Sequence, residues 1–267
     1  MADTYLEYIY WGRKGTKEML QKALGPALKA LELSPEEGGS YGALGAISFY
    51  RFERETAVSH LEKAIEINPN YVGAYDKLAW IRLFEGDMDE AVRLFGKIVE
   101  LDPLSTKNIA NIAFSHYFFH EFSKGISILD EALKKYPNDN MLLWMKGNLL
   151  AGNKQFDEAI KVLKKRTISG FDNNWMLAYA YAKSDQKNKA IEILNHQLEK
   201  IKTTYVPPYM IATIHMGLGD IESALDWLEK DLETGGLGLF IWGLKRDVKF
   251  DSIRENPRFA ALLNKIK

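Results

Sequence analysis

Apolar and polar positions repeat along this chain with a period of 34 residues. Each repeat ends in an apolar segment followed by a proline, as in Ile98 to Leu101 before Pro103. The prolines at this spacing are Pro35, Pro69, Pro103 and Pro137. A proline cannot continue a helix, and it holds the preceding residue in an extended conformation. The pattern therefore predicts a tandem array of helical units, each ending at its proline.

Within each unit, the spacing of small and large apolar residues predicts two antiparallel helices. We expect a small residue wherever the first helix crosses the second closely, because a larger side chain would push the pair apart. In the first helices these residues are Gly45, Ala79, Ala113, Gly147, Ala178 and Ala212. In the second helices they are Ala23, Ala57, Ala91, Gly125, Ala159, Ala190 and Ala224. The large residues that the second helices should bury are Leu61, Phe95, Leu129, Leu163, Leu194 and Leu228.

This arrangement resembles the tetratricopeptide repeat. The resemblance implies an all-α fold, a right-handed superhelical solenoid of about seven helix-turn-helix pairs. The expected units of this solenoid domain, 1–238, cover about 4–37, 38–71, 72–105, 106–139, 140–170, 171–204 and 205–238. The remaining segment, 239–267, carries an apolar run and a short amphipathic helix. We expect it to cap the last exposed apolar face of the solenoid.

The last part of the chain carries a more specific resemblance. Its motifs are Tyr205 to Ala212, Gly217 to Asp220, Ala224 to Lys230 and Phe250 to Phe259. They are similar to the C-terminal end of large bacterial signalling proteins, in which a tetratricopeptide array follows a cyclase, kinase or winged-helix output domain. The resemblance implies a sensory or scaffolding module in bacterial signalling, with no catalytic residues to transfer. The sequence starts directly in a predicted helix with no cap before it, which favours a piece of a longer protein over a natural short protein, and both alternatives stay open.

Composition removes several classes of function. The chain has no cysteine, which excludes disulfides, thiol catalysis and thiolate metal sites, and its net charge of -1 argues against nucleic acid as a partner. The longest stretch without charged residues, Thr203 to Gly219, contains two prolines and is shorter than the ~20 residues of a membrane-spanning helix. We therefore expect a cytoplasmic protein that binds neither nucleic acid nor membrane.

The chain also lacks the motifs of an enzyme active site. It has no phosphate loop, no nucleophile elbow and no clustered Ser, His and Asp, so we predict a non-catalytic protein without a cofactor. His116 and His120 lie four residues apart, which leaves a divalent metal site as an alternative to two structural histidines. We favour the structural role, because His116 falls where the repeat packs an aromatic ring.

The concave surface of the solenoid is the predicted binding site, because the first helices line it. These helices carry large aromatic rings, several with a polar atom, which are the side chains that often anchor protein interfaces. We expect Lys107, Asn111 and Asn148 to orient an extended or helical peptide through its backbone or its acidic groups. Part of the set, Phe114 above all, has core packing as its alternative role. The predicted peptide-binding residues are Lys77, Trp80, Lys107, Asn111, Phe114, Trp144, Asn148, Trp175 and Tyr179.

Two alternatives to peptide binding stay open. One is a structural self-association spacer for an absent output domain, and the other is a small-molecule sensor with an enclosed pocket. A clamp for the terminal carboxylate of chaperone peptides is incomplete, because Lys107 and Asn111 fit its pattern but Met141 and Met145 occupy the next unit.

The N-terminal edge predicts a possible homodimer. No repeat precedes the first helix to cover its apolar residues, and an uncovered solenoid end tends to associate. These residues are Tyr5, Tyr8, Ile9, Tyr10 and Trp11. In the alternative arrangement they fold onto Leu20, Ala23 and Leu24 of the second helix, and the protein is a monomer.

Overall fold

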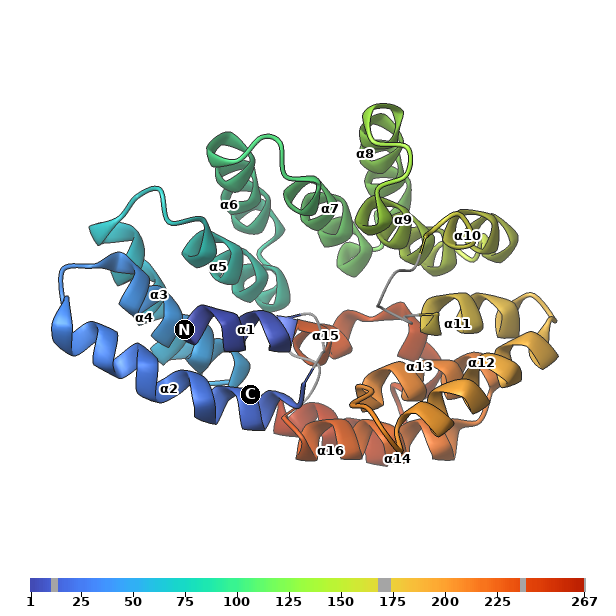
Figure 1. Ribbon diagram of the computed structural model, residues 1–267. Helices are drawn as coiled ribbons and strands as arrows, with labels where there is room; N and C mark the ends of the chain where they lie inside the picture. The colour runs from blue at the N-terminus through green and yellow to red at the C-terminus, as the bar shows by residue number, and fades with distance from the viewer. Residues whose placement is uncertain (11–13, 168–173, 236–238, 267) are drawn as a thin grey trace.

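The fold was obtained as a computed structural model, which describes residues 1–10, 14–167, 174–235 and 239–266 (Figure 1). Every regular element in these ranges is helical. Fourteen of the α-helices form seven antiparallel pairs, and this confirms the predicted all-α solenoid. The pairs are α1 (Ala2–Tyr10) with α2 (Thr16–Leu33), α3 (Gly38–Tyr50) with α4 (Arg54–Ile67), α5 (Val72–Glu85) with α6 (Met88–Leu101), α7 (Thr106–Ser115) with α8 (Phe122–Lys135), α9 (Asn140–Gly152) with α10 (Phe156–Leu163), α11 (Trp175–Lys183) with α12 (Lys187–Lys200), and α13 (Pro208–Leu218) with α14 (Ile221–Glu233).

The small residues at the helix crossings are required by close contact between the paired helices. A Cβ atom on Gly45 would lie 2.6 Å from Cγ of Leu61, and one on Gly147 would lie 2.4 Å from Cδ2 of Leu163. Both distances are far below ordinary van der Waals contact. These two pairs occupy equivalent places in the second and fifth pairs of helices, so the repeat pattern in the sequence corresponds to a repeated contact.

The turns between paired helices use glycine and aspartate for separate physical reasons. Gly86 and Gly219 end α5 and α13 with φ of 98° and 84°, in the left-handed region that glycine adopts without strain. Asp87 and Asp220 follow them and cap the next helix, each accepting a hydrogen bond from the backbone N–H three residues on, at 3.1 and 3.2 Å.

The two ends of the solenoid meet. The backbone N–H of Lys17 at the start of α2 donates to the carbonyl of Thr234, just after α14, over 3.2 Å. A Cβ on Gly235 would lie 3.1 Å from the same nitrogen of Lys17, so the two segments are in direct contact. Figure 1 shows the helix pairs arranged as a ring around an interior.

This arrangement gives no support to the predicted dimer. Leu6 and Ile9 of α1 are buried within the molecule, and α1 packs on both α2 and α3. Tyr5 and Tyr8 are partly buried against the core, while the side chain of Tyr10 and all of Trp11 lie outside the described residues.

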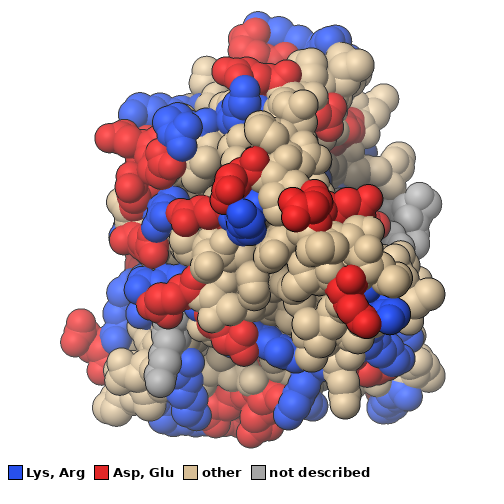
Figure 2. Space-filling view, turned by 90° about the vertical axis from the view of Figure 1, so that its left-hand side faces the viewer, with Lys and Arg blue, Asp and Glu red and all other residues tan. Residues whose placement is uncertain are grey.

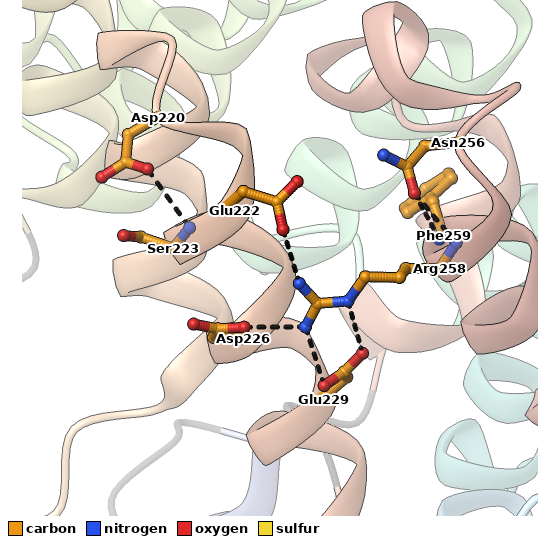
Figure 3. A network of polar contacts seen from close by, with 8 residues as sticks. All are labelled: Asp220, Glu222, Ser223, Asp226, Glu229, Asn256, Arg258 and Phe259. Carbon is orange, nitrogen blue, oxygen red and sulfur yellow. Dashed lines mark hydrogen bonds and ion pairs between the residues drawn. The ribbon is translucent and has the colours of Figure 1, made fainter.

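The two parts of the C-terminal segment lie in different places. Its last helix, α16 (Pro257–Lys265), packs on α14, where Arg258 binds three carboxylates (Figure 3). Nη1 of Arg258 lies 2.8 Å from Glu222, and Nη2 lies 2.7 Å from Asp226 and 3.0 Å from Glu229. The part before it, α15 (Leu239–Gly243) and the 3₁₀ segments η2 (Leu244–Arg246) and η3 (Val248–Ile253), runs through the interior of the ring (Figure 1). The sequence predicts the capping helix but not the interior path.

Candidate functional site

The predicted peptide-binding residues lie on four successive first helices, α5, α7, α9 and α11. Seven of them are buried, and the two lysines are partly exposed. The concave surface is therefore not an open groove, and α15 of the same chain packs against part of it, on Phe114, Trp144 and Trp175. The buried residues are Trp80, Asn111, Phe114, Trp144, Asn148, Trp175 and Tyr179.

Phe240 of α15 sits among aromatic rings from four first helices. Its ring centroid lies 6.3 Å from that of Phe114 on α7 and 5.9 Å from that of Trp144 on α9. It lies 5.9 Å from Trp175 on α11 and 5.2 Å from Tyr209 on α13. Three of these four contacts are edge-to-face, an arrangement that stabilises aromatic pairs. These five rings define the aromatic cluster.

Trp242, two residues later, fills the neighbouring part of the wall. Its ring stacks on Phe49 with centroids 5.3 Å apart and planes 9° apart, and it lies 6.4 Å from Phe84. Its Nε1–H donates to the carbonyl of Phe49 over 3.0 Å. This is the one hydrogen bond from a side chain of α15 to the wall among the residues whose contacts are described.

Two predicted aromatic residues belong to the core between helices and not to this cluster. The Trp80 ring, which is predicted to face the groove, lies 5.2 Å from Phe95 on α6, its own partner helix. Tyr179 packs against Gly217 on α13, with its ring 6.4 Å from Phe156. The 34-residue spacing does not reveal this difference, because a wide ring can turn toward either neighbour from the same helical position.

A buried polar cluster holds the segment that follows α15. The carboxylate of Asp247 accepts hydrogen bonds from the hydroxyls of Tyr117, at 2.7 Å, and Tyr209, at 2.5 Å. Nζ of Lys249 lies 2.9 Å from the same carboxylate and donates to the Tyr117 hydroxyl over 3.0 Å. All four residues are buried.

The ionisation of this cluster follows from its contacts. Burial by itself would raise the pKa of Asp247, but Lys249 and the two tyrosine hydroxyls outweigh burial and hold that pKa below its usual value. Burial lowers the pKa of Lys249. Burial, together with the Asp247 charge, raises the pKa of Tyr117 and Tyr209 well above the usual value of tyrosine. The ion pair and two neutral phenols therefore form one connected network.

At the other end of the wall, the carboxylate of Asp76 interacts with the predicted basic residues Lys77 and Lys107. This carboxylate lies 2.6 Å from Nζ of Lys77 and accepts a 3.1 Å hydrogen bond from Nδ2 of Asn111. Burial would raise the pKa of Asp76, but the charges of Lys77 and Lys107 and the hydrogen bond from Lys77 lower it on balance. Burial lowers the pKa of Lys107. Lys77 and Asn111 are thus already bound to Asp76, and the wall has no unopposed basic cluster here.

Four buried polar atoms in the middle of the wall have no hydrogen-bond partner among the described residues. They are the donors Nε1 of Trp144 and Nε1 of Trp175, and the acceptors Oδ1 of Asn111 and Oδ1 of Asn148. The amide nitrogens of both asparagines are bonded, to Asp76 and to the carbonyl of Trp144. Native proteins leave few buried polar groups unpaired, so four of them on α7, α9 and α11 mark this region as unusual.

His116 and His120 do not form a metal pair in this structure. The helix α7 ends at Ser115, and a 3₁₀ segment, η1 (His116–Phe119), separates the two side chains. Nδ1 of His116 lies 2.8 Å from Glu121, while the His120 ring stacks on Phe122. In the described ranges no group of three His, Asp or Glu residues could hold a metal ion.

The outer surface carries no large field of one charge on the face that Figure 2 shows, where acidic and basic side chains are interspersed. No helix among the described residues is both long and apolar enough to span a membrane.

Four residues that contact the wall from inside are not predicted from the sequence: Phe240, Trp242, Asp247 and Lys249. The apolar run from Leu239 to Leu244 is the available signal, because it belongs to no repeat and has to be buried somewhere.

Comparison with known families supports this architecture. The tetratricopeptide repeat family model matches residues 74–105, which contain all of α6 and all of α5 except Val72 and Gly73. A search of curated proteins finds no match.

Solved structures with the same fold have low sequence identity to this chain. The APC/C hetero-tetramer Cut9-Hcn1 contains a chain with a TM-score of 0.59 and 18% identity, and the match covers 99% of this chain and 49% of that one. This chain thus spans about half the length of that relative. The type IV pilus biogenesis factor PilW matches with a TM-score of 0.56 and 14% identity, over 80% of this chain and 96% of PilW. Pseudomonas aeruginosa pilF has a TM-score of 0.53 and 11% identity, over 83% and 96% of the two chains. These likenesses establish a tetratricopeptide-type solenoid.

Proposed function

We propose that this solenoid is a non-catalytic protein-interaction scaffold that binds a peptide segment along its inner wall. The binding residues in this proposal are Asn111, Phe114, Trp144, Asn148 and Trp175, with Lys77 and Lys107 at the edge. The observation that carries the proposal is the set of four unpaired polar atoms on Trp144, Trp175, Asn111 and Asn148.

A buried polar atom without a hydrogen bond costs roughly 1–3 kcal/mol, so the middle of the wall is destabilised as it stands. A peptide backbone carries both kinds of group that would relieve this cost. Its carbonyls accept from the indole N–H groups of Trp144 and Trp175, and its N–H groups donate to the amide oxygens of Asn111 and Asn148. Because all four atoms lie on first helices, one extended segment crossing α7, α9 and α11 could reach them in turn.

The aromatic rings around these atoms supply the apolar part of recognition. Phe114, Trp144 and Trp175 form a rigid surface on three successive helices, and large rings in buried positions commonly contribute most of the affinity of an interface. The ionisable groups near these rings are already paired with one another, Asp76 with Lys77 and Asp247 with Lys249. The arrangement suits recognition better than bond-making chemistry.

The biological setting belongs to this proposal as well. We infer a module of bacterial signalling from the resemblance of the last repeat and the motif that follows it to tetratricopeptide arrays of signalling proteins. We place the protein in the cytoplasm on the basis of its cysteine-free sequence.

The test removes one unpaired acceptor without removing a structural contact between side chains. Random 12-residue peptides displayed on phage are selected for binding to the parent protein. The dissociation constants of the selected peptides are then measured by fluorescence polarisation. Asn148→Leu removes the unpaired Oδ1 and should weaken binding about tenfold, which corresponds to the loss of one hydrogen bond of ~1.4 kcal/mol.

The same substitution should change the free energy of unfolding by no more than ~1 kcal/mol, because the lost hydrogen bond from Nδ2 to the carbonyl of Trp144 is offset by removal of the unpaired Oδ1 and its replacement by an apolar side chain of similar size. The control is Asn153→Ala at the exposed end of α9, which should not change the affinity. Selected peptides that bind Asn148→Leu as tightly as the parent would contradict the proposed site.

A further inference from the structure

The interior part of the C-terminal segment divides into two halves with different kinds of contact. In the second half, Asp247 and Lys249 pair with each other and with Tyr117 and Tyr209, and the carboxylate oxygens have donors of matching geometry. Phe250, also in this half, is fully buried against Tyr209 and Phe259.

In the first half, α15, the described side-chain contacts with the wall are made by two rings, those of Phe240 and Trp242. Phe240 fills the aromatic cluster but carries no polar atom in its side chain, so it can satisfy neither indole N–H beside it. Trp242 makes a single hydrogen bond, to the carbonyl of Phe49 on α3, away from α7, α9 and α11. Phe240 itself is only partly buried, although it lies among the rings of four helices.

We propose that α15 is an intramolecular placeholder on the peptide site, and that the partner is a peptide with an aromatic side chain that takes the position of Phe240. This inference rests on the proposed function and names the class of its ligand. The placeholder matches the wall in shape and apolar character but not in hydrogen bonding. The partner replaces it by matching all three.

The contacts also define which part of the C-terminal segment stays bound when a partner displaces α15. The network of Asp247, Lys249, Tyr117 and Tyr209 pins the chain after η2, so release of α15 leaves η3 and α16 in place. Because α15 is part of the same chain, it competes with the partner for the site at an effective concentration in the millimolar range. The partner should therefore bind the parent protein more weakly than a variant in which α15 has lost its rings. The segment thereby determines how tightly a peptide must bind in order to occupy the site.

A labelled synthetic peptide with the sequence of residues 239–246, Leu-Phe-Ile-Trp-Gly-Leu-Lys-Arg, serves as the probe. Its dissociation constant is measured by fluorescence polarisation against the full chain and against the full chain carrying Phe240→Ala and Trp242→Ala. We expect binding to the double variant to be at least about tenfold tighter than to the parent. Equal binding to both proteins, or binding to neither, would overturn the placeholder.

Phe250→Ala is the matched control, because it also removes a buried ring of the C-terminal segment but leaves α15 intact. It should not tighten binding of the probe, and an equal gain in affinity would trace the effect to general loosening and overturn the proposal. Circular dichroism of each variant checks that it is folded.

A second measurement uses only the parent protein and so does not depend on the folding of a variant. At saturating probe, hydrogen exchange of the amides at 240–243 should accelerate while that of 249–253 stays slow. Unchanged exchange at 240–243 in the saturated complex would overturn the proposal. Failure of this inference can be told apart from failure of the proposed function. The phage selection tests whether peptide binding depends on Asn148, whereas this experiment tests whether a bound peptide displaces α15.

Discussion

Tyr117 and Asp247 are separated by 130 residues in the sequence, and a hydrogen bond of 2.7 Å joins them. Tyr117 belongs to the 3₁₀ segment after α7, in the wall of the solenoid, whereas Asp247 belongs to the segment that runs through its interior. Lys249 completes the contact by bonding to both residues. The wall and the segment inside it are thus joined by hydrogen bonds between tyrosine hydroxyls of the wall and a buried ion pair of the segment, and not by apolar packing alone.

Removal of the buried carboxylate should be strongly destabilising. Asp247→Ala leaves Lys249 charged and unpaired in the interior, and breaking a buried pair in this way costs about 3–5 kcal/mol. Asp251→Ala is the control, because this carboxylate is exposed and pairs with Arg254, so its loss should cost no more than ~1 kcal/mol. Urea unfolding followed by circular dichroism measures both, and similar losses for the two variants would contradict the role of Asp247.

The stabilising effect of Asp247 should depend on pH in the acid range. Its pKa in the folded protein lies below the ordinary value, so the unfolded chain binds a proton more readily than the folded one. The stabilisation is therefore complete above the ordinary pKa of about 3.9 and is lost as the pH falls through the lower folded value. The difference in unfolding free energy between the parent and Asp247→Asn, measured from pH 6 down to about pH 2, should shrink below pH 4. A difference independent of pH would show that the carboxylate charge is not involved.

Two glycine-to-alanine substitutions in helix interiors should change the stability of the protein in opposite directions. Gly147→Ala forces a Cβ to within 2.4 Å of Leu163 and should destabilise the protein by ~1–3 kcal/mol. At Gly96 on α6 a Cβ meets no atom within 4 Å, so Gly96→Ala should stabilise the protein by ~0.5–1 kcal/mol through helix propensity. Thermal unfolding of both variants tests the pair, and a stabilising Gly147→Ala would disprove the close crossing.

The two halves of the interior segment should differ in local stability without any added ligand. The amides of 240–243 should exchange with solvent faster than those of Lys249 and Phe250, because ring contacts and one hydrogen bond hold the first half, whereas a buried ion pair with two tyrosine hydroxyls holds the second. Hydrogen exchange with mass spectrometry of short proteolytic fragments resolves the halves. Equal protection of both would indicate that the segment opens as one unit.

The contact between α16 and α14 should be sensitive to salt. Arg258 bonds to Glu222, Asp226 and Glu229 on the molecular surface (Figure 3), where dissolved ions screen charge pairs. Arg258→Gln should lower the melting temperature at low ionic strength, and the difference from the parent should decrease in 1 M sodium chloride, where screening acts over about 3 Å. A constant difference would mean that packing, and not charge, holds α16.

The sequence predicts those features that depend on neighbours within one or two repeats. The pairing of Gly45 with Leu61 and of Gly147 with Leu163 recurs at a fixed spacing, so the periodic pattern exposes it. Helix ends are predictable for the same reason, since Gly86 and Asp87 act on the adjoining turn.

The interior segment is not predictable in this way. The contact between Trp242 and Phe49 spans 193 residues, and no periodic signal relates the two positions. Trp144 and Trp175 stand at positions that face the inside of the solenoid, but the sequence does not reveal that Phe240 of the same chain covers them. The orientation of Trp80 is a third case, because packing against Phe95 decides it.

The hydrogen bond between Lys17 and Thr234 has a consequence for how the molecule unfolds. In an open repeat array each unit contacts only its neighbours, so the terminal units can melt first and the remainder can stay folded. Here the first and last pairs of helices support each other, and the segment inside the ring touches α3, α7, α9, α11 and α13 at once. Melting of either end would therefore cost contacts at the opposite end as well, which couples distant repeats into a single cooperative transition.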